Sequence, residues 1–174
     1  MKSKGNIVFL GMMGSGKTVI GRLVSRKLGL NFIDIDENIE NKFGMKISKI
    51  FSDKGENFFR QIEEKVTFDA LKKKKSIIAL GGGGFLNKNI RDEIKKNHLS
   101  FWLKNNPKIL INRIKNSYKR PLAINATVNE LSILIEKRSN IYKKALYKVD
   151  CDNLTKIEIT KKIISIYNDN EINS

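Results

Sequence analysis

The chain has 174 residues, of which 40% are hydrophobic and 30% charged, which fits one soluble globular domain and argues against a disordered segment. No apolar run approaches the roughly 20 residues needed to cross a bilayer, and glycines interrupt the N-terminal segment before a signal peptide could form, so we expect a cytoplasmic protein with no membrane partner. The single cysteine, Cys151, and the single histidine, His98, exclude an internal disulfide and a Cys/His metal cluster.

The charge balance is strongly basic, with 34 Lys and Arg against 18 Asp and Glu and a formal net charge of +16. Such a charge raises the question of a nucleic-acid partner. However, 27 of the basic residues are Lys and only 7 are Arg, and Lys, Ile and Asn together fill 71 positions, which indicates a general compositional bias. The chain also lacks an arginine-rich stripe and a set of stacking aromatics. We therefore expect no nucleic-acid partner, and a nucleic-acid-binding protein is the competing hypothesis from another class.

The first half of the chain alternates short apolar runs with helical patterns. Residues 6–10 predict a buried strand, and the apolar spacing of residues 20–28 predicts a helix that is closed by Gly29. Residues 32–36 predict a second strand that runs into two carboxylates. After a further short helix, the pattern over residues 56–71 predicts another helix with an apolar face.

The second half continues the same alternation. Asn106 and Pro107 form a good helix start, because Asn can cap and Pro is tolerated in the first turn. Residues 127–130 and 155–158 each carry the capping-box pattern that begins a helix. Three more strands are expected, at residues 76–80, 99–103 and 147–150, the last at an edge of the sheet.

This alternation predicts an α/β fold, a three-layer α/β/α sandwich around a five-stranded, mainly parallel sheet, in a single domain over residues 1–174. Ligands of such sheets bind outside the carboxyl ends of the strands. In this chain those ends are residue 11 onward, residues 34–36 and the glycine run at residues 81–84.

Residues 11–18, GMMGSGKT, match the phosphate-loop motif directly after the first strand. Its glycines let backbone N–H groups surround phosphates, Lys17 reaches the outer phosphate oxygens, and the Thr18 hydroxyl can ligate Mg²⁺. The N-K-x-D motif of a GTPase is absent and motor proteins are usually longer, so a small-molecule kinase that uses ATP is favoured. The residues expected to bind the nucleotide are Gly14, Ser15, Gly16, Lys17, Thr18 and Val19.

Further segments join the phosphate loop in an order and spacing that resembles the shikimate kinase family, whose fold is like that of nucleoside monophosphate kinases. They are residues 34–36, 55–63, 81–83, 120–122 and 137–142. The resemblance implies ATP-dependent phosphorylation of the 3-hydroxyl of shikimate, in the chorismate and aromatic amino acid pathway, with Mg²⁺ as cofactor. We expect a monomer, because nothing in the sequence requires a larger assembly. The resemblance also implies a substrate-binding region at about residues 34–62 and a lid at about residues 115–126. The alternative is another small-molecule kinase, such as a gluconate kinase.

The two carboxylates of residues 34–36 take the acceptor and the metal in this family. Asp36 is implied as the catalytic residue that accepts a hydrogen bond from the 3-hydroxyl, and Asp34 together with Thr18 as the ligands of Mg²⁺. The competing interpretation is that Asp36 caps the helix that follows, a common role of Asp at such a boundary.

Two arginines and the glycine run are implied as the rest of the shikimate site. Arg60 and Arg138 resemble a clamp for the substrate carboxylate, because a guanidinium group can hold two carboxylate oxygens at once. Glu63 lies about one helical turn after Arg60 and can orient it. Gly82 and Gly83 are expected to bring backbone N–H groups against the substrate, with a plain turn as the alternative.

The lid and the base-binding region complete the resemblance. Arg120 is implied to close over the transferring phosphoryl group, as a catalytic and nucleotide-binding residue beside Lys17. Arg113 is implied to pack against adenine. Residues 151–154, CDNL, depart from the small polar residues and proline that the family usually has near adenine.

The sequence allows two interpretations of the aromatic residues Phe51 and Phe59. They either wall the substrate pocket or belong to the core, since an aromatic residue on a helix is more often a core residue.

Overall fold

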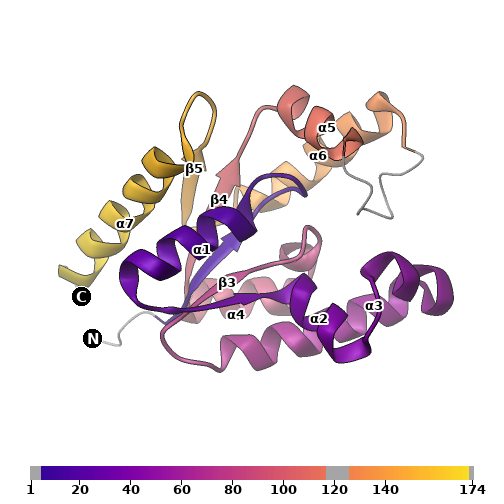
Figure 1. The fold of residues 1–174 in the computed structure, drawn as a ribbon, viewed down its shortest axis with the longest axis horizontal. Helices are drawn as coiled ribbons and strands as arrows, with labels where there is room; N and C mark the ends of the chain where they lie inside the picture. The colour runs from indigo at the N-terminus through magenta and orange to yellow at the C-terminus, as the bar shows by residue number, and fades with distance from the viewer. Residues whose placement is uncertain (1–4, 117–125, 173–174) are drawn as a thin grey trace.

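The computed structural model describes residues 5–116 and 126–172, in which strands and helices alternate (Figure 1). The strands form one sheet in the order β2-β3-β1-β4-β5, and every neighbouring pair is parallel. The predicted five-stranded parallel α/β fold is therefore confirmed. The strands are β1 (Ile7–Leu10), β2 (Asn31–Asp34), β3 (Ser76–Ala79), β4 (Leu99–Lys104) and β5 (Tyr147–Asp150).

Helix boundaries follow the capping signals of the sequence. The Asn106 side chain accepts from the backbone N–H of Lys108 at 2.9 Å, with Pro107 in the first turn, and Thr127 and Glu130 cap each other in a complete capping box. The helices are α1 (Lys17–Leu28), α2 (Ile35–Phe43), α3 (Ile47–Leu71), α4 (Lys88–Asn97), α5 (Pro107–Lys115), α6 (Val128–Tyr142) and α7 (Lys156–Ile172), with a short 3-10 helix at Gly84–Leu86.

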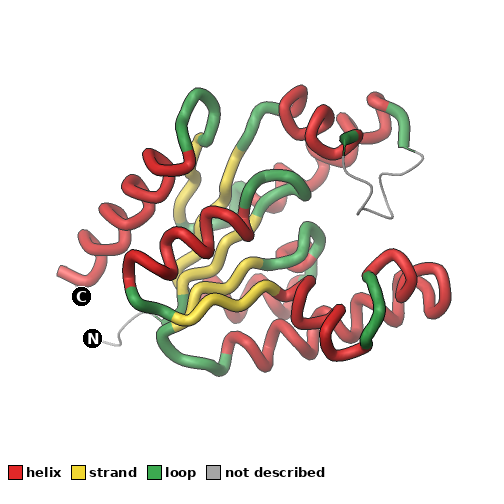
Figure 2. Tube along the Cα trace, viewed as in Figure 1, coloured by secondary structure: helices red, strands yellow, loops and turns green. Residues whose placement is uncertain are grey.

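Helices cover both faces of the sheet, which makes three layers (Figure 2). The alternation of side chains along β1 shows how the core is divided. Val8 and Leu10 belong to the apolar cluster that packs under α3, α4 and α6, whereas Ile7 and Phe9 belong to the cluster that packs under α1 and α7. Because β1 lies in the middle of the sheet and is buried along its whole length, the loop that follows it is held rigidly at the carboxyl edge.

The second strand is shorter than the sequence predicts. β2 ends at Asp34 and α2 begins at Ile35, so Asp36 lies in the first turn of a helix and not on a strand. The reason is local capping, because the Asp34 side chain accepts from the backbone N–H of Glu37 at 3.2 Å and thereby starts the helix. The prediction that this strand continues to Asp36 is therefore wrong.

Two helical segments differ from the sequence expectation. The helix predicted over residues 56–71 forms, but α3 already begins at Ile47 and carries a break at Gly55, whose φ of 83° and ψ of 168° are not helical. Helix α4 was not predicted, because Ile90 and Ile94 are its only buried residues in an otherwise polar stretch. Too few apolar positions remain there to reveal a period.

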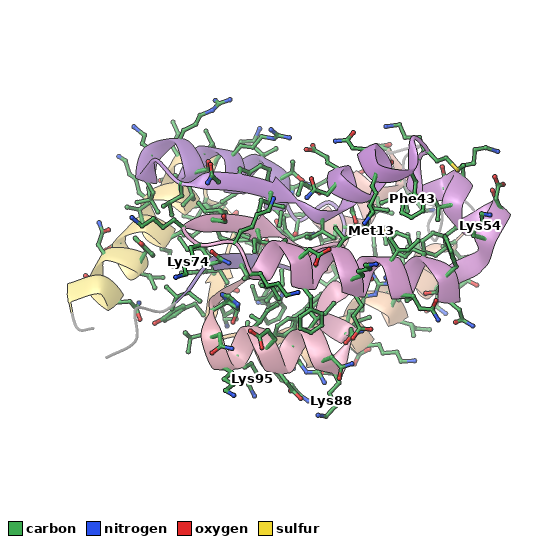
Figure 3. The ribbon with its side chains drawn as sticks, turned by 90° about the horizontal axis from the view of Figure 1, so that it is seen from below. Met13, Phe43, Lys54, Lys74, Lys88 and Lys95 are labelled. Atoms are coloured by element: carbon green, nitrogen blue, oxygen red, sulfur yellow. The ribbon has the colours of Figure 1, made fainter. Side chains whose placement is uncertain are left out.

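Most of the lysine charge lies on the outside of the molecule. Seen from below, the labelled side chains of Lys88 and Lys95 point away from the ribbon (Figure 3), and Lys54, Lys74, Lys88 and Lys95 are all exposed. In the described part of the chain, no helix has both the length and the hydropathy of a membrane span.

Candidate active site

The phosphate loop connects β1 to α1 and depends on glycine at its turns. Gly11, Gly14 and Gly16 have φ values of 144°, 78° and 94°, a region that residues with a side chain rarely adopt. Lys17 is 8% exposed, and its Nζ donates to the carbonyl oxygens of Gly11 and Met12 at 2.9 and 3.0 Å. The Ser15 hydroxyl is buried without a protein partner. The loop thus offers a buried cation and an unused hydroxyl at the carboxyl edge of the sheet.

Thr18 and Asp34 form an oxygen pair next to this loop. The Thr18 hydroxyl donates to Asp34 Oδ2 at 2.7 Å, and both residues line the same cavity. Hydroxyl and carboxylate oxygens are the ligands that Mg²⁺ prefers, and Mg²⁺ usually keeps waters and phosphate oxygens as its other ligands. Among the described residues no group of three or more His, Cys, Asp or Glu could hold a metal alone. The pair therefore fits a metal that arrives with a nucleotide.

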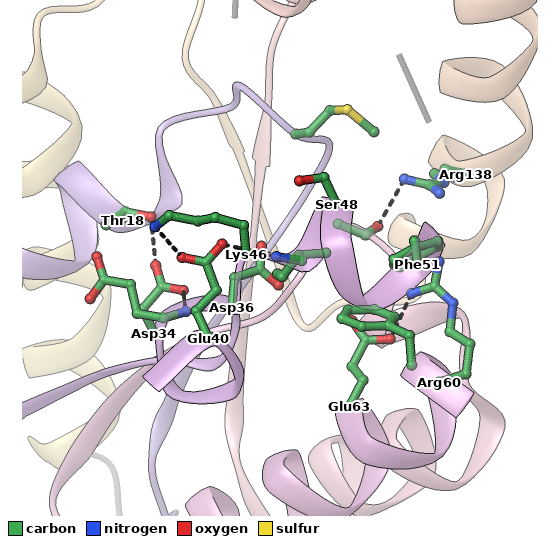
Figure 4. A pocket seen from close by; sticks show the side chains of 16 residues that line it. Thr18, Asp34, Asp36, Glu40, Lys46, Ser48, Phe51, Arg60, Glu63 and Arg138 are labelled. Carbon is green, nitrogen blue, oxygen red and sulfur yellow. Dashed lines mark hydrogen bonds and ion pairs between the residues drawn. The ribbon is translucent and has the colours of Figure 1, made fainter. Parts of the chain in front are cut away.

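A cavity of about 530 Å³ opens beside this pair, between the glycine run, α2, α3 and α6 (Figure 4). It brings together side chains that lie far apart in the sequence. At one end lie Thr18, Asp34 and Glu40, and at the other lie Phe51, Arg60, Glu63 and Arg138. All residues expected to bind the substrate or the metal line this one cavity: Thr18, Asp34, Asp36, Arg60, Gly82, Gly83 and Arg138.

Arg60 is held in place by two carboxylates on its own helix. Its Nη1 donates to Glu63 Oε2 at 2.7 Å, and its Nε and Nη2 donate to Glu56 Oε1 at 3.2 and 3.1 Å. Burial raises the pKa of the Glu63 carboxyl, although the nearby Arg60 and Arg138 act in the opposite direction. The sequence predicts that Glu63 orients Arg60, and the hydrogen bond between Arg60 Nη1 and Glu63 Oε2 is the contact that can do so.

Phe51 and Phe59 take part in both the core and the cavity. Their ring centroids lie 4.6 Å apart, both residues line the cavity, and the Arg60 guanidinium carbon lies 5.2 Å from the centre of the Phe59 ring. Phe59 is also 3% exposed and part of the core. The two readings of these aromatics are therefore compatible.

Arg138 and Tyr142 come from α6 and meet the glycine run. Arg138 is 5% exposed, its Nη1 donates to the carbonyl of Gly82 at 3.4 Å, and its Nε is buried without a partner. The Tyr142 hydroxyl also donates to the Gly82 carbonyl, and burial raises the pKa of Tyr142 to about 12. Tyr142 thus stays a protonated donor that fixes the loop against Arg138.

The glycine run is required because charged side chains pack directly on it. A Cβ at Gly83 would collide with the Arg60 guanidinium. A Cβ at Gly81 would lie 2.5 Å from Glu63 Oε1 and 2.7 Å from Asp36 Oδ1. Gly81 was not expected among the site residues, and its only signal in the sequence is its place in the run.

Asp36 lies at the point where the two ends of the cavity meet. Its Oδ1 faces the backbone of Gly81 beside the buried carboxylate of Glu63. The cap of α2 is Asp34 and not Asp36, so the competing interpretation of Asp36 as a helix cap is wrong. Asp36 lines the cavity together with Arg60, Glu63 and Arg138.

A second cavity, of about 410 Å³, lies on the other side of the phosphate loop. Its lining includes Arg113, whose Nη1 donates to Gly14 O at 3.1 Å and to Asn105 Oδ1 at 3.2 Å. Cys151 and Leu154 line it as well, so the segment expected near adenine lies beside the loop. Asn105 and Lys156 also line this cavity, and no motif in the sequence indicates them. Gly14, Ser15, Gly16 and Val19 complete the loop side of the cavity.

Arg120 and most of the expected lid lie outside the described residues. Glu40 and Lys46, by contrast, line the first cavity without any motif in the sequence that indicates them.

Comparisons with known proteins agree with this geometry. The shikimate kinase family profile matches residues 13–168. A shikimate kinase from Thermodesulfovibrio yellowstonii is 40% identical over 163 residues, which cover 93% of this chain and 94% of that protein. The chain belongs to the shikimate kinase family.

The solved structures extend the comparison to three dimensions. A shikimate kinase from Acinetobacter baumannii in complex with shikimate superposes with a TM-score of 0.90 at 29% identity, over 97% of this chain and 95% of that chain. A gluconokinase from Sinorhizobium meliloti has a TM-score of 0.54 at 16% identity, over 95% and 92% of the two chains, and shares the fold alone. As a shikimate kinase family member, this chain is an ATP-dependent kinase that phosphorylates an alcohol group.

Proposed function

We propose that this chain transfers the γ-phosphoryl group of ATP to the 3-hydroxyl of shikimate in the 530 Å³ cavity. One observation carries the proposal, namely that the cavity has two buried or half-buried arginines at one end and the phosphate loop with its carboxylates at the other. An acceptor that carries a carboxylate and a hydroxyl fits this polarity, with the hydroxyl next to the phosphates. Positioning and charge stabilisation then supply most of the catalysis.

Arg60 and Arg138 bind the substrate carboxylate in this proposal. The buried Nε of Arg138 has no protein partner, and an unpaired buried donor is costly until a ligand accepts its hydrogen bond. The Arg60 guanidinium is already oriented by Glu63 at 2.7 Å. A carboxylate between the two guanidinium groups gains charge-assisted hydrogen bonds. Gly82 and Gly83 leave the space that the substrate ring needs.

Asp36 positions the attacking hydroxyl and accepts its hydrogen bond. Its carboxylate lies next to Gly81 and lines the cavity, between the clamp and the Thr18–Asp34 pair. A carboxylate in this place directs a lone pair of the substrate oxygen toward the phosphoryl group and can take the proton as the bond forms.

The phosphate side is served by the loop and the residues around it. Lys17 moves from its carbonyl partners to the outer phosphate oxygens, where its charge offsets the charge of the transferring group. Thr18 and Asp34 hold Mg²⁺, which when bound neutralises the phosphate oxygens. Arg113 and Val19 border the nucleotide, and Arg120 is assigned to the closing lid from the sequence alone.

A gluconate kinase is the alternative within the same reaction class. The likeness to the gluconokinase concerns the fold alone, at 16% identity. Release of ADP, measured with shikimate, gluconate, a nucleoside monophosphate or no acceptor, tests the proposal. We expect stimulation by shikimate only, and stimulation by gluconate but not by shikimate would contradict it.

The protein's setting is also part of the proposal. We infer a monomer in the cytoplasm that uses ATP, Mg²⁺ and shikimate, without a nucleic-acid or membrane partner. The exposed lysines come from several elements, for example Lys54 from α3, Lys88 from α4 and Lys161 from α7. Retention on DNA at about 150 mM salt, where non-specific phosphate contacts are strongly weakened, would contradict this inference.

A further inference from the structure

The end of the cavity that receives the phosphoryl group is rich in negative charge. Asp34, Asp36, Glu37 and Glu40 line the cavity and come from one short segment at the start of α2, and of these Glu37 is paired with Arg22 at 2.7 Å. Arg60 and Arg138 lie at the opposite end (Figure 4). Transfer adds a phosphate with a charge of about −1.5 to −2 to the acceptor oxygen beside Asp36. The product is therefore formed next to carboxylates that repel it.

Lys46 is the cation that reaches this end of the cavity from α3. It precedes the first turn of α3 and lines the cavity. In Figure 4 its side chain extends toward the end where Thr18 and Asp34 lie. Its Nζ donates to Glu40 Oε2 at 2.8 Å. Among the described residues that line the cavity, the other cations are Arg60 and Arg138, which lie at the far end.

Glu40 holds this lysine in position without burying it. Glu40 Oε1 accepts from the backbone N–H of Ile47 at 3.1 Å, so one oxygen of Glu40 is tied to the backbone and the other to Lys46. The Lys46 side chain is 78% exposed, whereas that of Glu40 is 26% exposed. An exposed ion pair of this kind is weak, and a phosphate dianion in the cavity competes for the ammonium group with a larger charge.

We propose that Lys46 binds the phosphate group of the product and makes the cavity select shikimate 3-phosphate over shikimate. The inference rests on the proposed function, because it takes the acceptor and its orientation from there. Lys46 leaves Glu40 when the phosphate forms and donates to the phosphate oxygens. It thereby offsets the repulsion from the carboxylates of α2 and sets how tightly the product is held before release.

Calorimetric titration of shikimate and of shikimate 3-phosphate, without nucleotide, tests this role in the wild type and in Lys46→Met. We expect the variant to bind shikimate 3-phosphate about fivefold more weakly, the upper range for an exposed charge pair, and shikimate with less than a twofold change. Lys49→Met is the matched control, because Lys49 is also exposed on α3, pairs with Asp53 at 3.0 Å and does not line the cavity. It should change neither affinity.

Lys46→Met also leaves Glu40 without its cation, and the extra negative charge could by itself weaken product binding. A second variant, Glu40→Gln, separates this effect from the loss of a direct contact with the phosphate. In Glu40→Gln the lysine loses its partner, so product affinity should stay equal or rise. In the double variant Glu40→Gln/Lys46→Met it should fall by the same fivefold or so relative to Glu40→Gln. An unchanged product affinity in Lys46→Met, an equal loss for shikimate and its phosphate, or a full recovery in the double variant would overturn the inference. Failure of the wild type to bind shikimate would instead overturn the proposed function.

Discussion

Buried polar atoms lack hydrogen-bond partners at the carboxyl ends of the strands, whereas they are hydrogen-bonded at the amino ends. At the carboxyl edge, Ser15 Oγ, Glu63 Oε1 and Arg138 Nε are buried without a protein partner, and they are three of the four such atoms in the described part of the chain. At the amino edge, the Asn6 side chain donates to two backbone carbonyls at 2.9 and 2.6 Å and accepts from Ser76 N at 3.0 Å.

We interpret the unpaired polar atoms at the carboxyl edge as serving ligand binding and the hydrogen-bonded ones at the amino edge as stabilising the fold. A buried polar atom without a partner costs free energy, and such atoms gather where a ligand can satisfy them. At the amino edge, the buried Asn6 side chain is hydrogen-bonded and joins the start of β1 to the end of α3 and to β3. The Asn6 backbone N–H also donates to Nδ1 of His98, the residue before β4, at 3.0 Å. Substitutions at the carboxyl edge should therefore change catalysis, and those at the amino edge should change the free energy of unfolding.

The largest expected effect is at the phosphate loop. Lys17→Ala should lower kcat by about a thousandfold, because it removes a preorganised cation from the transferring phosphoryl group. The measurement is ADP release at saturating shikimate and ATP. Lys27→Ala, an exposed lysine in the last turn of the same helix, should keep the wild-type kcat. A kcat within tenfold of the wild type in Lys17→Ala would remove Lys17 from the catalytic residues.

The second effect is at the amino edge. Asn6→Ala should lower the free energy of unfolding by about 3 kcal/mol, because it leaves backbone groups of three segments without partners. Denaturant unfolding measures this change. Ser52→Ala, which removes an exposed side chain that bonds within its own helix, should stay within about 0.5 kcal/mol of the wild type. If Asn6→Ala also lowers the free energy of unfolding by no more than about 0.5 kcal/mol, the hydrogen bonds of Asn6 contribute little to stability.

A methyl group added to the glycine run gives a smaller effect. Gly83→Ala should raise the KM for shikimate by roughly tenfold, because its Cβ displaces the Arg60 guanidinium. Gly84→Ala is the matched control, since a Cβ there would lie at least 3.6 Å from any neighbouring atom. Steady-state kinetics with varied shikimate compare the two. Equal KM values would mean that the position of Arg60 does not matter for shikimate binding.

The smallest effect concerns pH. Burial lowers the pKa of His98 below its ordinary value of 6.5, although Glu93 acts in the opposite direction. The neutral ring accepts from Asn6 N, so its contribution to stability is present above pH 6.5 and is lost as the pH falls through the lower folded pKa. Between pH 7 and pH 5, the free energy of unfolding should fall more in the wild type than in His98→Asn, which keeps an acceptor but does not titrate. Parallel unfolding curves at both pH values would contradict this.

The sequence predicts the parts of the site that depend on local motifs. Lys17 and Thr18 follow from the phosphate loop and the order of strand and helix. Arg60 and Arg138 follow only from the family resemblance, because two arginines 78 positions apart give no sign by themselves that they share a cavity. The structure places them around the same glycine run.

Other features could not be predicted because they arise from tertiary contacts. Asn6 and His98 meet over 92 positions, and neither belongs to a motif. Lys46 reaches the cavity only because α3 begins at Ile47, nine residues before the start that the pattern indicates. The break at Gly55 interrupts the apolar period and hides this first part of the helix.

The contrast between the two edges is tested most directly by kcat/KM for shikimate in Arg138→Ala and Asn6→Ala, measured at a temperature where both variants are folded. We expect a fall of about 30- to 100-fold in Arg138→Ala, since it removes a buried charged donor from the substrate, and less than a twofold change in Asn6→Ala. A wild-type value in Arg138→Ala, or an equal loss in both variants, would contradict the account.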